Sequence, residues 1–184
     1  MRNSVFSLLA LAGLAFGQSY YETHASIRNT FSGGISLAVS EGSSNMNPGV
    51  SACIEPIKMI NTYFGAGGHI DYTWLSMKNL DSAESRGGHF FDISFVPKAY
   101  LPISTNKCFS FEVDPGLYGV YAYFWWGGYK NSDFKLFFGL TSGVTFTIEA
   151  FSFIIKFKSI ITEDNYVLRT RIVNWMSFCA GIAL

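Results

Sequence analysis

Charged residues are scarce in this sequence. Asp, Glu, Lys and Arg make up only 14% of its 184 residues, whereas a soluble domain contains roughly 25%. Long apolar stretches are also missing, since no segment has the roughly eighteen uninterrupted apolar residues that a transmembrane helix needs. These two absences argue against an ordinary water-soluble domain and against a helical membrane protein.

The sequence also lacks the signs of a nucleic-acid, metal or cofactor site. Its 13 basic residues balance 13 acidic ones, and no basic run interleaves with aromatic residues, which argues against a nucleic-acid partner. The side chains that most often bind metals are scattered without ligand spacing. They are His24, His69, His89, Cys53, Cys108 and Cys179. We therefore expect no metal and no cofactor.

The first residues predict a secretory signal peptide over residues 1–17. Arg2 supplies the positive start, Val5 to Ala15 is an apolar run, and small residues precede a cleavage point after Gly17. A buried N-terminal helix is the weaker alternative. Export leaves residues 18–184 as a single domain.

A strict alternation of period two ends the sequence. From Met176 to Leu184 every even position is apolar, and the odd positions hold Ser177, Cys179, Gly181 and Ala183. Such a pattern is typical of a strand with one apolar face. Gly is also abundant at 18 residues, and aromatic residues reach 17%. An aromatic-rich strand with an apolar face suits contact with lipid.

The same alternation recurs upstream and gives eight strands in all. We predict them at Phe31–Val39, Val50–Ile60, Tyr63–Met77, His89–Leu101, Cys108–Trp126, Phe134–Ile148, Phe151–Ile161 and Val173–Leu184. The connections alternate in length, as they do in outer-membrane barrels with long outer loops and short periplasmic turns. The long ones are Ser40–Gly49, Lys78–Gly88, Gly127–Asp133 and Thr162–Ile172, and the short ones lie around Asn61, at Ile103–Lys107 and at Glu149–Ala150. The pattern predicts an all-β fold, an eight-stranded antiparallel up-and-down transmembrane β-barrel.

A soluble barrel with an apolar interior is the competing all-β interpretation. It requires many charges on the polar face of each strand. Here that face is mostly Gly, Ser and Thr, which fits a narrow, crowded lumen better than an exterior in water.

The strand and loop rhythm, together with the terminal segment Asn174–Leu184, resembles small bacterial outer-membrane barrels of the OmpA/OmpX type. In that family the last strand is the signal read by the barrel-assembly machinery, and it ends in an aromatic residue where this sequence has Leu184. The resemblance implies an assembly signal made of Met176, Phe178, Ala180, Ile182 and Leu184. It also implies a monomer in the bacterial outer membrane, with membrane lipids, the assembly machinery and periplasmic chaperones as partners.

Charged residues on the inward faces separate by sign along the chain. We expect them to form a paired lumen network of Glu55, Asp71, Asp92, Glu112, Asp114, Lys135, Lys156 and Lys158. Buried charges must be paired, and the lumen of an eight-stranded barrel is only wide enough for side chains. The alternative is that these residues line a narrow pore.

A catalytic site is the least supported interpretation of the lumen. His69 shares a strand face with Asp71, and the strand order brings Asp92, Ser94 and Ser110 nearby. These groups suggest a nucleophile and a base for lipid acyl transfer. Since polar residues inside any barrel meet by chance, we predict no enzymatic activity.

Aromatic residues gather near the outer ends of two strands. Trp74, Tyr121, Tyr123 and Trp125 form the predicted interfacial girdle. On the opposite face, Val120, Ala122, Phe124 and Trp126 leave an apolar mouth that suits a hydrophobic ligand.

The strand that carries these aromatic residues is longer than the roughly ten residues that a spanning strand needs, so its outer part should project. The expected function is structural or one of surface interaction, with an extracellular partner at the loops. A narrow transporter for small or hydrophobic molecules and a lipid-modifying enzyme are the two alternatives.

Overall fold

The computed structural model describes residues 27–39, 46–76, 84–105, 107–126, 128–161 and 172–183. Their regular structure consists of eight strands: β1 (Ile27–Ala38), β2 (Gly49–Asn61), β3 (Phe64–Ser76), β4 (Glu84–Ser104), β5 (Lys107–Trp126), β6 (Tyr129–Ile148), β7 (Phe151–Ile161) and β8 (Ile172–Ala183). Across these ranges, no helix has the length and apolar character needed to cross a bilayer. The predicted signal peptide and Leu184 lie outside the described residues.

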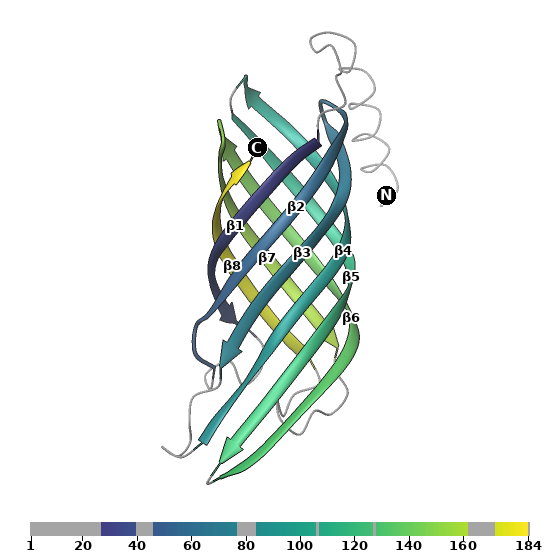
Figure 1. Ribbon diagram of the computed structural model, residues 1–184. Helices are drawn as coiled ribbons and strands as arrows, with labels where there is room; N and C mark the ends of the chain where they lie inside the picture. The colour runs from purple at the N-terminus through teal and green to yellow at the C-terminus, as the bar shows by residue number, and fades with distance from the viewer. Residues whose placement is uncertain are drawn as a thin grey trace, which may run out of the picture.

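The strands form a closed antiparallel barrel in sequence order (Figure 1). β1 closes the ring by pairing with β8, from Thr30 opposite Ala183 to Ala38 opposite Trp175. Short turns join β2 to β3, β4 to β5 and β6 to β7 at one end, which we call the turn end. The start of β1 and the end of β8 lie at this same end. We call the opposite end, where β3 finishes and β4 begins, the loop end.

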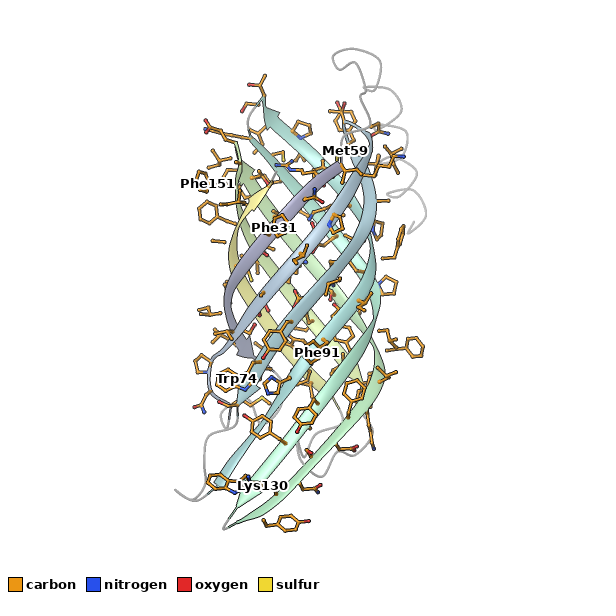
Figure 2. The ribbon with its side chains drawn as sticks, in the orientation of Figure 1. Phe31, Met59, Trp74, Phe91, Lys130 and Phe151 are labelled. Carbon is orange, nitrogen blue, oxygen red and sulfur yellow. The ribbon has the colours of Figure 1, made fainter. Side chains whose placement is uncertain are left out.

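The alternation in the sequence corresponds to the two faces of the barrel wall, one facing the lumen and one facing outward. Apolar side chains such as Phe31, Ile54, Ile93 and Phe153 lie exposed on the outer face, whereas their neighbours in sequence point into the lumen and are largely buried. Figure 2 shows the outward side chains around the barrel, with Phe31, Phe91 and Phe151 among them. So large an apolar exterior is unfavourable in water and is the face that a membrane barrel presents to lipid. The predicted all-β barrel and the face assignments of its eight strands are confirmed.

Two predicted boundaries at the loop end are wrong, and at the turn end β1 begins at Ile27 rather than Phe31 and β4 ends at Ser104 rather than Leu101. The segment Gly127–Asp133 was expected to be a loop, but β6 begins at Tyr129 and pairs with β5 from Trp126 opposite Tyr129 onward. Likewise, β4 begins at Glu84 rather than at His89. The β5–β6 hairpin therefore extends beyond the closed part of the barrel at the loop end (Figure 1). From Tyr129 to Leu136 every residue of β6 is exposed, whichever face it occupies.

Candidate functional site

Four buried charges form a closed cluster in the half of the lumen nearer the turn end. Lys98 of β4 contacts Glu55 of β2 and lies 2.7 Å from Glu112 of β5. Lys156 of β7 lies 3.2 Å from Glu55 and 3.0 Å from Glu112. Two cations and two anions thus alternate across four strands, so each charge has two partners of opposite sign. We call these residues the four-charge cluster.

A second group of ionisable residues, which we call the histidine cluster, lies further along the lumen toward the loop end. His69 lies between two carboxylates. Its Nε2 atom is 2.6 Å from Asp92, and its Nδ1 atom is 3.6 Å from Asp114. Lys158 of β7 forms an ion pair with Asp71. Hydroxyl groups complete the arrangement, because Ser94 donates to Asp92 at 2.6 Å. Ion pairing and hydrogen bonding make buried ionic groups tolerable, and both reach Asp92. His69 Nδ1, Lys158 Nζ and both carboxylate oxygens of Asp114 have no hydrogen-bond partner among the described residues.

Lys135 does not belong to the buried network that the sequence predicted. Its side chain is 43% exposed and it forms an ion pair with Asp133 on the same strand. The reason is its height, since it belongs to the projecting part of β6 rather than to the closed barrel. Sequence reasoning also left Lys98 out, although its inward position on β4 was the available signal. The other seven predicted members lie buried in the lumen.

The lumen does not pair Ser94 with His69, as the catalytic interpretation of the sequence would require. Ser94 and His69 both direct their hydrogen bonds to Asp92, so the serine hydroxyl is paired with a carboxylate instead of the imidazole. Ser110 is buried elsewhere on the inner face of β5. Within the described ranges, no group of three or more His, Cys, Asp or Glu side chains is arranged to hold a metal ion.

Gly116 leaves the space that the Ser94–Asp92 contact occupies. A Cβ atom at this position would overlap the Ser94 hydroxyl and lie 2.6 Å from Asp92 Oδ1. We expect Gly116→Ala to lower the free energy of unfolding by about 1–3 kcal/mol, as overpacking does, measured by urea titration in phospholipid vesicles.

The matched control for this glycine is Gly33→Ala, because the nearest atom to a Cβ at Gly33 is the Ser51 carbonyl oxygen at 3.5 Å. The control should change the free energy of unfolding by less than about 0.5 kcal/mol. Equal effects at the two glycines would contradict the packing described for the lumen.

Apolar side chains fill the lumen beyond the histidine cluster. We call this cluster the apolar plug, and it consists of Leu75, Phe90, Tyr118, Val120, Ala122, Phe137, Ile160, Val173 and Trp175. Trp175 is fully buried and packs against Phe90 with ring centroids 4.9 Å apart. Lys158 Nζ lies 5.8 Å from the Trp175 ring centroid. This cation–π contact joins the apolar plug to the histidine cluster on its turn-end side.

The sequence predicted an open apolar mouth, but the structure has a packed apolar interior at Val120 and Ala122. Val120 and Ala122 do face inward, but they are buried within the plug. The side chains of Phe124 and Trp126 lie outside the described part of the structure. Missing from the sequence prediction were Leu75, Phe90 and Trp175, whose apolar character on inward positions was the available signal.

The residues of the predicted girdle all lie on the outer face near the loop end. Tyr121 is 39% exposed and Trp125 is 46% exposed. Trp74 donates from Nε1 to the Tyr123 hydroxyl at 3.3 Å, which joins β3 to β5 across the outside of β4. The described members of the proposed assembly signal, Met176 to Ile182 at even positions, also point outward on β8.

Comparison with known proteins identifies the fold. No protein-family model matches the sequence, and no curated protein matches it. Solved structures of several proteins, including the following three, match across nearly their whole length. The attachment invasion locus protein Ail of Yersinia pestis, in complex with the heparin analogue sucrose octasulfate, is 12% identical, with a TM-score of 0.55 over 86% of this chain and 99% of that one.

Neisserial surface protein A is 14% identical, with a TM-score of 0.54 over 86% of this chain and 96% of that one. The N-terminal β-barrel domain of Pseudomonas aeruginosa OprF is 8% identical, with a TM-score of 0.51 over 85% of this chain and 97% of that one. The chain therefore has the fold of small eight-stranded outer-membrane β-barrels.

Proposed function

We propose that the chain is an integral protein of the bacterial outer membrane with a structural or surface-interaction role and no enzymatic activity. The observation that carries this proposal is the closed barrel with an apolar exterior and a filled lumen. Closure leaves no sheet edge to face lipid, and the exposed apolar side chains match the hydrocarbon core. Residues 1–17 serve as the signal peptide, and residues 18–184 form the mature monomer.

Assembly follows from the proposed location. The outward side chains of β8 act with Leu184 as the signal for the barrel-assembly machinery, after periplasmic chaperones deliver the unfolded chain. The turn end then faces the periplasm and the loop end faces the exterior, as in other outer-membrane barrels. Trp74, Tyr121, Tyr123 and Trp125 form a girdle at the outer membrane surface.

The projecting β5–β6 hairpin is the part of the proposed protein that is best placed to meet an extracellular partner. Exposure of both faces of β6 from Tyr129 to Leu136 sets this segment apart from the membrane-spanning strands, whose inner faces are buried. The exposed stretch carries Lys130, Asp133 and Lys135. Because β5 and β6 are paired up to Trp126 opposite Tyr129, the hairpin presents such side chains on an already ordered backbone, which lowers the entropic cost of binding.

Cysteine labelling on intact cells tests the proposed location and orientation. We expect Ser132→Cys, on the hairpin, to react with a membrane-impermeant maleimide, and Lys107→Cys, at the turn end, to react only after the outer membrane is permeabilised. The parent chain sets the background from Cys53, Cys108 and Cys179. Labelling of both variants in intact cells, or of neither, contradicts the orientation.

A shortened hairpin tests the role in surface interaction. Replacing residues 124–131 by Asn-Gly closes the strands at the pair Tyr123–Ser132 with a tight turn. Cells that display the full chain should adhere to a heparin-coated surface more strongly than cells with the shortened chain. Heparin is the probe because the Ail structure holds a heparin analogue. Equal adhesion contradicts a role for the hairpin, and stepwise conductance of the purified barrel in planar bilayers supports the transporter alternative instead.

A further inference from the structure

Five side chains on the outer face of β3, β4 and β5 form a continuous group around His89, which we call the His89 cluster. Trp74, His89 and Tyr121 lie side by side in register on the three strands. Tyr72 and Tyr123 flank this row. His89 is thus an ionisable side chain pointing outward, in a belt that is otherwise aromatic and apolar at this height.

Contacts within the cluster hold His89 in place. Its Nδ1 atom lies 2.7 Å from the Tyr72 hydroxyl. Its ring centroid lies 5.9 Å from that of Tyr72, 6.0 Å from that of Tyr121 and 5.8 Å from that of Tyr123. Tyr123 in turn extends over Gly87, where a Cβ atom would lie 2.7 Å from the Tyr123 hydroxyl oxygen. The cluster is therefore preorganised before any ligand arrives.

Its height places the cluster at the rim of the closed barrel. Trp74 lies two residues before the end of β3, at the loop end, and Figure 2 shows it on the outer surface there. Phe91 and Ile93, which follow His89 on the outer face of β4 toward the turn end, are exposed apolar residues suited to the hydrocarbon core. In the proposed orientation the His89 cluster therefore lies among the headgroups of the outer leaflet.

The chemistry of the cluster fits a phosphorylated sugar. In the tautomer in which Tyr72 donates its hydroxyl hydrogen to Nδ1, the imidazole hydrogen lies on Nε2. Among the described residues only Tyr72 bonds to this ring, so the Nε2–H group is available to a phosphate oxygen. The exposed faces of Tyr121 and Trp125 suit the apolar face of a sugar ring, and Lys130, opposite Trp125 in register, adds positive charge further out.

We propose that the His89 cluster binds the phosphorylated disaccharide headgroup of lipid A in the outer leaflet. The proposal rests on the proposed outer-membrane location. In this complex a phosphate oxygen of lipid A accepts a hydrogen bond from His89 Nε2–H. A sugar ring of the headgroup stacks on the exposed rings of Tyr121 and Trp125. Phospholipids have a phosphate but no sugar ring. They could therefore accept the hydrogen bond from His89 but could not stack a sugar on Tyr121 and Trp125.

The test uses the folded chain in phosphatidylcholine nanodiscs, with lipid A added to one set and phosphatidylglycerol to another. The readout is the NMR signal of the Trp74 indole N–H group, assigned by its loss in Trp74→Phe. We expect lipid A to shift this signal and His89→Phe to weaken the apparent affinity about tenfold, which corresponds to roughly 1.4 kcal/mol. Tyr72→Phe, which removes the partner of Nδ1, should weaken it in the same direction.

Phe134→Leu is the matched control, because Phe134 lies opposite Tyr121 in register at the same height but contributes no polar group. This control should keep the parent affinity. An equal response to phosphatidylglycerol, or unchanged affinity in both the His89 and Tyr72 variants, overturns the site while leaving the proposed location intact. Failure of the parent chain to enter nanodiscs overturns the location and the site together.

Discussion

Lys156→Met should be among the most destabilising single changes in this protein, lowering the free energy of unfolding by about 3–5 kcal/mol. Lys156 is almost completely buried and is a shared partner of Glu55 and Glu112. Methionine has a similar length but no charge, so the change leaves two carboxylates in the lumen with Lys98 alone. The loss is a large fraction of the roughly 5–15 kcal/mol that stabilises an ordinary domain. Urea titration in phospholipid vesicles measures it.

A second substitution separates charge balance from packing at this position. The double variant Lys156→Met/Glu112→Gln removes one charge of each sign and leaves the Lys98–Glu55 pair. We expect it to be more stable than Lys156→Met alone. Lys58→Met, at an exposed lysine of β2, should change stability by less than about 0.5 kcal/mol. A double variant that is no more stable than the single one contradicts the pairing.

The membrane-facing half of this architecture could be predicted from the sequence because lipid imposes a simple rule. Every outward position from Phe31 to Ile182 that meets hydrocarbon must be apolar, and a narrow polar lumen requires the opposite at the next residue. Strand number, face assignment and the short turns follow from this period of two. The buried carboxylates and Lys156 and Lys158 were found in the same way, because they occupy inward positions.

The rule no longer applies where the chain leaves the membrane. Around Asn131 and Ser132 both faces of β6 meet solvent, so no apolar face exists to mark the strand, and the segment has the composition of a loop. Strand pairing with β5 determines the conformation there, and pairing is not visible in one strand alone. Lys135 was assigned to the lumen because it occupies an inward-facing position in the alternation of β6. It lies, however, in the part of β6 that projects beyond the closed barrel.

The apolar plug escaped prediction for the opposite reason. Around Phe90 and Trp175 the inner face is apolar, and the outer face includes the polar residues His89 and Asn174, so the alternation of polar inward and apolar outward residues disappears while the strand continues. Which inward side chains meet depends on strand tilt and stagger. The same dependence hid the role of Lys98 on β4, whose partner Glu112 lies on the neighbouring strand β5 and whose partner Glu55 lies two strands away on β2.

Phe178→Arg on the outer face of β8 should abolish insertion into the outer membrane. Phe178 lies in the middle of the strand, opposite Ile35 of β1 and Ile155 of β7. An arginine on the lipid face near the bilayer midplane costs about 2–4 kcal/mol, and loss of the buried aromatic surface adds to that cost. The substitution also interrupts the proposed assembly signal, so it should slow recognition as well as weaken the folded state.

Cys179→Ser, one residue further along β8, is the matched control because its side chain points into the lumen instead of toward lipid. We expect the Cys179 variant to insert normally, whereas the Phe178 variant should accumulate in the periplasm or be degraded. Fractionated membranes analysed by gel electrophoresis with and without heating measure the inserted, folded fraction. Equal insertion of the two variants would contradict the register of β8, because that register alone assigns neighbouring residues to lipid and to lumen.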